Sequence, residues 1–148
     1  MRLSARSEYG LLALIDLAAA EDDRPMATRE LAEGRGIPTA FLEQLLADLR
    51  RAGLVRATRG PRGGFALTRS AAEITALEIV EALEGPIAPS VCAPGACGRE
   101  DGCAAASVWG DVSGAVRDAL SGFTLARLAA EQARLDRAPL TCTTRRND

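Results

Sequence analysis

The first part of the chain repeats apolar residues at helical spacing. Steps of three or four residues place side chains on one face of an α-helix. The repeating residues are Leu11, Leu14, Ile15 and Ala18. The pattern breaks at the charged, proline-containing segment EDDRP. An amphipathic helix over residues 4–20 is therefore predicted to form part of the core.

The next segment predicts two helices joined by a tight turn. Thr28 is expected to cap a short helix, and Gly34 and Gly36 to turn the chain. Pro38 suits the first turn of a longer helix that Gly53 ends. The buried stripe of that helix would consist of Phe41, Leu42, Leu45, Leu46 and Leu49. A short helix, a glycine turn and a longer helix form a helix-turn-helix.

Two short strand-like runs, LVRAT and FALT, follow on either side of RGPRGG. Glycine and proline let the backbone reverse between strands, so the segment predicts a hairpin that acts as a wing. The expected fold is mainly α with a small β-hairpin. Residues 1–85 would form a winged helix-turn-helix domain.

The second half predicts two further helical segments. Thr75 and Glu78 have the spacing of a capping box, and Gly85 would end a helix over residues 75–84. Beyond a cysteine-rich loop at residues 86–104, an apolar stripe recurs at three or four residues. It consists of Val108, Val112, Val116, Leu120 and Phe123, with Trp109 beside it. The stripe either packs on its own domain or forms a two-helix dimer interface. We favour the dimer interface, because proteins that bind two-fold symmetric DNA sites act as dimers. Residues 105–135 are thus assigned to a dimerisation helix and a C-terminal helix, and residues 136–148 to a disordered tail.

The distribution of charge along the chain is informative about function, whereas the net charge is not. The 148 residues carry a formal charge of only -2. Between residues 50 and 69, however, there are six arginines and no acidic residue. They are Arg50, Arg51, Arg56, Arg59, Arg62 and Arg69. Beside a helix-turn-helix, such a cationic patch predicts binding to double-stranded DNA; without a groove-entering element it would be an ordinary solvated face.

The helix-turn-helix assigns roles to single residues. The second helix presents its first polar residues to base edges in the major groove. These are Thr39, Ala40, Glu43 and Gln44, and Thr28 is grouped with them as a DNA-facing residue. Gln44 matches adenine, Glu43 matches cytosine, and Ala40 offers only a methyl contact. Arg59 at the wing tip suits the minor groove. Arg50, Arg51, Arg56 and Arg62 would contact phosphates, the alternative for each being a solvated side chain.

Three of the four cysteines lie within CAPGACGREDGC, as Cys92, Cys97 and Cys103. Their C-x4-C-x5-C spacing lacks the paired knuckles or histidines usual for zinc, whereas glycine-rich loops with thiolates hold iron–sulfur clusters. The chain contains no histidine, so the fourth ligand would be a carboxylate, Cys142, a small thiol or solvent. A zinc site, a metal-free thiol redox switch and structural disulfides are the alternatives.

The sequence disfavours a membrane protein, a secreted protein and an enzyme. The first apolar run is short and interrupted by Asp16, so we expect neither a membrane span nor a signal peptide, and a cytoplasmic location. No nucleophile–base pair or phosphate loop is recognisable, and RGPRGG lacks the lysine and helix of a P-loop, so no enzyme is expected. A partner-binding module that controls an enzyme is the remaining alternative.

Several segments together resemble the Rrf2 family of winged-helix regulators. They are MRLSARSEYGLLAL, GIPTAFLEQLLADLRRAGLV, RGPRGGFAL, the cysteine trio and VWGDVSGAVRDALSGFTLARLA, over residues 1 to about 132. The resemblance implies a homodimer on palindromic promoter sites, with one iron–sulfur cluster per subunit on Cys92, Cys97 and Cys103. It also implies base reading by Glu43 and Gln44, and minor-groove insertion by Arg59.

The chain departs from the cluster-binding regulators of that family at two positions and in the gap between its first two cysteines, which is one residue shorter. Ala106 replaces a histidine three residues after the third cysteine, and Ala40 replaces a base-reading serine. Some members supply a carboxylate ligand from the first helix of the opposite subunit, at the position of Glu8; the alternative is that Glu8 only favours the start of that helix. As a whole, the resemblance implies a cluster-dependent regulator that senses iron, redox state or nitric oxide.

Overall fold

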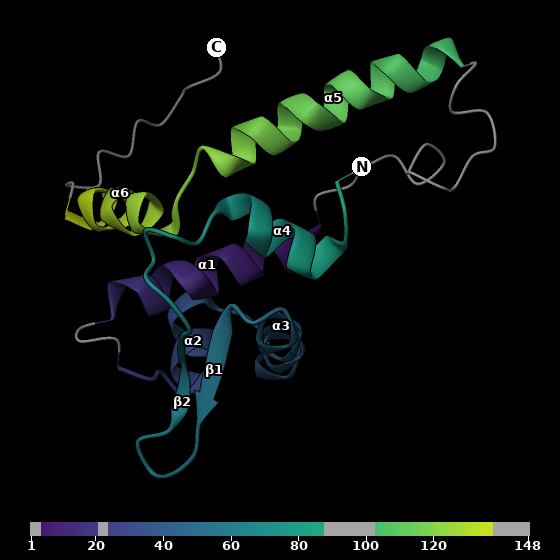
Figure 1. The fold of residues 1–148 in the computed structure, drawn as a ribbon. Coiled ribbons are helices and arrows are strands. Elements are labelled where there is room, and N and C mark those ends of the chain that lie inside the picture. The colour runs from purple at the N-terminus through teal and green to yellow at the C-terminus, as the bar shows by residue number, and fades with distance from the viewer. Residues whose placement is uncertain (1–3, 21–23, 88–102, 138–148) are drawn as a thin grey trace, which may run out of the picture.

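The computed structural model describes residues 4–20, 24–87 and 103–137, and it confirms a mainly α fold with one small hairpin (Figure 1). The elements are α1 (Ala5–Ala19), α2 (Thr28–Arg35), α3 (Thr39–Arg51), β1 (Val55–Thr58), β2 (Gly64–Leu67), α4 (Ala76–Glu84), α5 (Ala104–Ser121) and α6 (Leu125–Arg137). The expected tail from residue 138 onward lies outside the described residues, whereas residues 136 and 137 belong to α6. No helix in the described ranges is long and apolar enough to cross a membrane.

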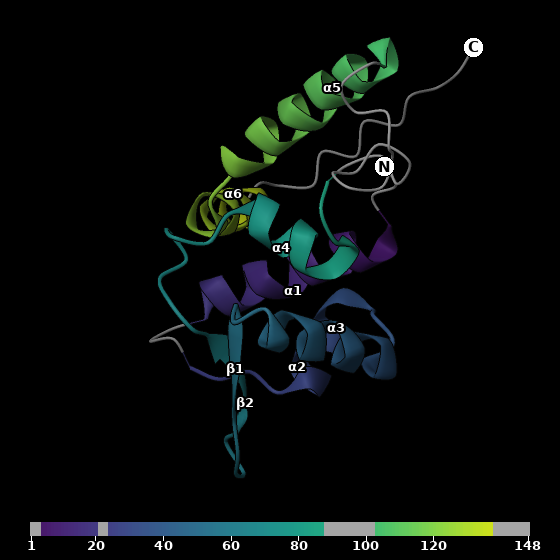
Figure 2. The ribbon, with the colours of Figure 1, turned by 45° about the vertical axis from the view of Figure 1, so that its right-hand side comes forward.

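Helix α1 lies at the centre of the domain, between α4 and α6 on one side and α2 and α3 on the other (Figures 1 and 2). Of its predicted apolar face, Leu14 and Ile15 are buried, and Leu11 and Ala18 are partly buried against the core. Leucines of α3, isoleucines around α4 and Leu125 of α6 complete a single core. Gly10 permits the closest helix contact, since a Cβ there would lie 2.2 Å from Leu83 Cδ1. The periodicity of the sequence thus predicted the central helix and its packing face.

The helix-turn-helix forms as expected, with two local corrections. Thr28 is the first residue of α2 and not its cap, because the chain stays extended through Ala27, which occupies the cap position. Gly34 lies within α2; the turn is made by Gly36, whose left-handed φ of 64° suits glycine. Pro38 then precedes α3 directly.

The hairpin pairs β1 and β2 antiparallel, from Val55 opposite Leu67 to Thr58 opposite Gly64. A third segment joins it: Met26 N donates to Phe65 O at 2.9 Å, and Phe65 N donates back at 2.8 Å. This bridge holds Met26 in an extended conformation, and α2 begins two residues later, at Thr28, with Ala27 in the cap position. The bridge also attaches the predicted wing to the helix-turn-helix.

The capping box of α4 is confirmed. Thr75 Oγ1 accepts from Glu78 N at 3.3 Å, and Glu78 Oε2 accepts from Thr75 N at 2.9 Å. After α4, the two C-terminal helices differ in what they pack against. Helix α6 packs on α1 within the same chain, whereas α5 contacts α4 and extends past it, away from the wing (Figure 1).

Candidate nucleic-acid interface

Helix α3 has one buried and one exposed face. Leu42, Leu45, Leu46 and Leu49 are fully buried. The four residues predicted to read bases are all exposed, and all lie in the N-terminal half of the helix: Thr39, Ala40, Glu43 and Gln44. Burial of the leucine stripe therefore fixes which side chains of α3 point outward. The arrangement is that of a recognition helix.

The wing projects from the helices on the side opposite α5 and α6 (Figure 2). Arg59 and Arg62 are exposed in the loop between the strands, and neither forms a hydrogen bond or an ion pair within the described residues. Both guanidinium groups are thus available to an external anion. Arg56, by contrast, donates from Nε to Leu67 O at 3.3 Å across the hairpin.

The six arginines are therefore not equivalent. Arg50 is exposed at the end of α3. Arg51 forms an ion pair with Asp48 one turn earlier, and Arg69 pairs with Glu78. The Arg51 side chain remains 79% exposed, so this pair contributes little and leaves Arg51 able to exchange partners. The charges along the sequence could not show which arginines form ion pairs, because pairing depends on the fold.

The cysteine-based site is only partly described. Cys92 and Cys97 lie outside the described residues, while Cys103 is free and exposed at the residue before α5. Glu8 is exposed in the first turn of α1. Thr28 is half-buried at the start of α2. Within the described ranges, no three potential metal ligands come together.

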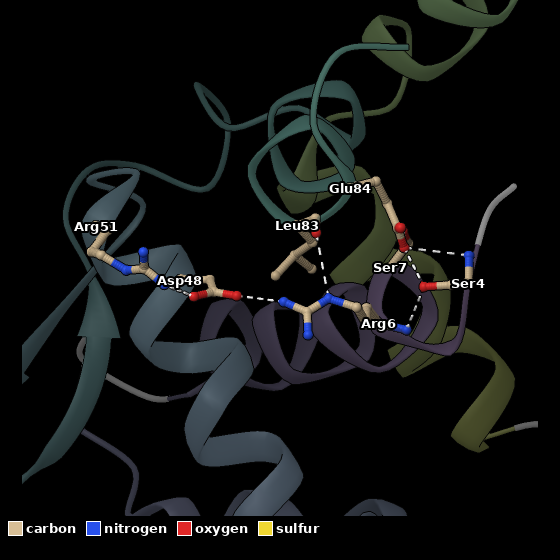
Figure 3. Close-up of polar contacts among 7 residues, drawn as sticks. All are labelled: Ser4, Arg6, Ser7, Asp48, Arg51, Leu83 and Glu84. Carbon is tan, nitrogen blue, oxygen red and sulfur yellow. Dashed lines mark hydrogen bonds and ion pairs between the residues drawn. The ribbon is translucent and has the colours of Figure 1, made fainter. Parts of the chain in front are cut away.

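A polar cluster that the sequence did not reveal joins α1, α3 and α4 (Figure 3). Arg6 pairs with Asp48, 42 residues away, and Glu84 accepts hydrogen bonds from Ser4 and Ser7. Burial raises the pKa of Glu84, but the hydrogen bonds from the two serines outweigh it and hold that pKa below its usual value. Neither periodicity nor spacing marks these residues, because their partners are distant in sequence.

Comparison with known proteins now decides the family. Residues 3–131 match the model of the Rrf2 family, described as iron-dependent transcriptional regulators. The chain belongs to the Rrf2 family. The transcriptional regulator IscR of Escherichia coli strain K12 is 33% identical over 137 residues, which cover 92% of this chain and 85% of that protein.

Solved structures agree. CymR, the global cysteine regulator of B. subtilis, superposes with a TM-score of 0.75 at 33% identity, over 88% of this chain and 98% of that one. IscR of T. potens also gives 0.75, at 31% identity, over 94% and 93%. The oxidized form of Staphylococcus aureus CymR gives 0.69 at 35% identity, over 87% and 96%. The predicted family and winged-helix fold are confirmed: this Rrf2 chain is a DNA-binding transcriptional regulator and not an enzyme.

Proposed function

We propose that this Rrf2 protein binds palindromic promoter operators as a homodimer and that its cysteines make this binding depend on iron, redox state or nitric oxide. The exposed N-terminal face of α3 beside the wing supports this proposal most directly. Glu43 and Gln44 there would read base edges, and Arg59 would enter the minor groove. Arg50, Arg51 and Arg62 would contact phosphates, with Thr28 at the start of α2 beside them. The protein would act in the cytoplasm, where thiols stay reduced.

Helix α5 supports the dimer. Val108, Trp109 and Val112 are 57%, 43% and 42% exposed, on a helix that only partly contacts its own domain. An apolar stripe of this kind favours association with a second copy, as two-fold operators require. Two recognition helices would then face successive major grooves.

The wing provides the test of DNA binding. Arg59→Ala should weaken operator binding by roughly 1 to 3 kcal/mol, because it removes a cation from the minor groove. The measurement is a fluorescence anisotropy titration at fixed salt. Arg134→Ala is the matched control, since Arg134 is an exposed arginine of α6 paired with Glu131. Equal affinities for the Arg59→Ala variant and the unmodified protein would remove the wing from the mechanism.

The thiols fit an iron–sulfur cluster by the chemistry of the donor set. Cys103 is exposed and unpaired, so its thiolate is accessible as a ligand. Cys92 and Cys97 would complete the trio, and Glu8 from the partner subunit is the proposed further ligand. When bound, the cluster would supply a response to iron, oxidants or nitric oxide. The three cysteines of one subunit and Glu8 of the partner subunit would hold it.

Metal and sulfide content test this assignment. Protein purified without oxygen should contain matched iron and acid-labile sulfide, and Cys103→Ser should lose both. Cys142→Ser is the control, because Cys142 follows the part of the chain that matches the family. Zinc without sulfide would favour a zinc site. Absence of both, even after reconstitution, would favour a metal-free thiol switch, a candidate supported by the likeness to the oxidized form of CymR.

A further inference from the structure

One arginine joins the ends of two helices that carry different parts of the proposed function. Arg6, in the first turn of α1, donates from Nε to Leu83 O in the last turn of α4 at 3.4 Å. Its Nη2 pairs with Asp48 Oδ2 in the last turn of α3 (Figure 3). The planar guanidinium fixes the directions of both contacts. The ends of α3 and α4 are thus held at one point.

The end of α4 is also fastened to α1 by a second contact. Glu84 Oε1 accepts from Ser7 Oγ at 2.6 Å and from Ser4, which caps α1. The close packing of Leu83 against Gly10 holds the two helices together at the same level. The last turn of α4 therefore cannot move without disturbing the turn that bears Arg6.

These contacts join the helix that precedes the cysteine segment in sequence to the helix that carries the candidate recognition surface. The chain leaves α4 at Glu84 and, after Ile87, enters the segment that contains Cys92 and Cys97. At its other contact, Asp48 belongs to the helix whose exposed N-terminal face is the candidate base reader. Asp48 is only 20% exposed and also pairs with Arg51. A displacement of Asp48 would thus affect both the angle of α3 and the position of Arg51.

We propose that Arg6 is a positioning residue that couples the end of α4, and through it the cysteine segment, to the recognition helix α3. This inference rests on the proposed roles of α3 and of the cysteines. A shift of α4, caused by binding of the iron–sulfur cluster or by oxidation of the cysteines, would withdraw the Leu83 carbonyl from Arg6. Arg6 would then reorient, and Asp48 would move with it. Coupling of this kind requires two arrangements of the same contacts, which a cycle of variants can measure.

Hydrogen exchange of the whole protein tests the coupling without DNA. Glu84→Ala loosens the end of α4 from α1 and should speed amide exchange in residues 45–51 of α3 by roughly 2- to 30-fold. In an Arg6→Met background, which keeps the apolar stem, Glu84→Ala should add no further change there. Equal effects of Glu84→Ala in both backgrounds, or none in either, would overturn the proposal. Asp48→Asn cuts the same connection from α3 and replaces Arg6→Met if that variant unfolds.

Glu81→Ala is the matched control. Glu81 is a carboxylate of the same helix that pairs with Arg117 of α5 and accepts a hydrogen bond from Ile87 N at 3.4 Å, so its loss also loosens the chain after α4, but not the contact to α1. Its loss should leave exchange of residues 45–51 unchanged. Operator affinity, measured over the same cycle, should be non-additive in the same way. If the unmodified protein binds no operator, the proposed function is wrong, whereas the exchange data still decide whether Arg6 couples the two helices.

Discussion

At the scale of single residues, Gly64 is constrained by the close approach of a neighbouring backbone. Gly64 lies where β2 meets the segment before α2, with a φ of 153°. A Cβ there would lie 2.2 Å from Met26 O, a backbone atom held in the bridge to Phe65. We expect Gly64→Ala to destabilise the fold by at least about 2 kcal/mol, because both strain and overlap oppose it. Urea unfolding followed by circular dichroism measures this.

Gly34→Ala is the control for that prediction. Gly34 lies inside α2, and a Cβ there would have no neighbour within 4 Å. Alanine in a helix is favoured over glycine by about 0.5 to 1 kcal/mol, so this variant should be slightly more stable. If the two alanine variants had equal stability, the close approach at Gly64 would not contribute to the fold.

At the scale of elements, local sequence predicted most of what the structure shows. The apolar stripes gave the buried faces of α1 and α3, and the Thr75–Glu78 spacing gave the start of α4. The predicted start of α2 was wrong by one position: the bridge to Phe65 ends at Met26, Ala27 takes the cap position, and the helix begins one residue earlier than expected. The Arg6–Asp48 pair could not be predicted, since its two residues meet only after helices distant in sequence pack together.

The capping box of α4 gives a prediction about a single element. Thr75→Ala removes the side-chain acceptor for the Glu78 N–H, a loss that costs about 1 kcal/mol at helix N-caps. The free energy of unfolding in urea should fall by that amount. Ser121→Ala, which removes an exposed hydroxyl bonded within α5, should change it by less than about 0.5 kcal/mol. A Thr75→Ala variant as stable as the unmodified protein would show that packing alone defines the start of α4.

At the scale of the whole molecule, the two ends of the domain expose different kinds of surface. The wing lies at one end of the domain and α5 extends from the other (Figures 1 and 2). Exposed side chains are mainly polar or cationic on α3 and the wing loop, whereas Val108, Trp109 and Val112 of α5 are exposed apolar residues. The Arg6 cluster lies between these surfaces, where α1 contacts both α3 and α4. In the proposed function, dimerisation and DNA binding would therefore use separate surfaces. A charge placed on the exposed apolar stripe of α5 should therefore weaken operator binding chiefly by changing the oligomeric state.

Val112→Glu tests that separation. Val112 is already 42% exposed, so a carboxylate there should leave the single chain folded. In the proposed dimer it would be buried without a partner, a strongly unfavourable state. We expect sedimentation analysis at micromolar concentration to show one chain per particle instead of two. Operator affinity should fall as well, because each chain would then bind one half-site alone.

The matched control places the same charge on another face of α5. Ser107 is exposed one residue before Val108, about a quarter-turn or more away from the apolar stripe on a helix of 3.6 residues per turn. Ser107→Glu should remain a dimer and keep its operator affinity. A Val112→Glu protein that stays dimeric would exclude the apolar stripe as the interface. A monomeric Val112→Glu protein with undiminished affinity would instead show that one winged helix suffices for the operator.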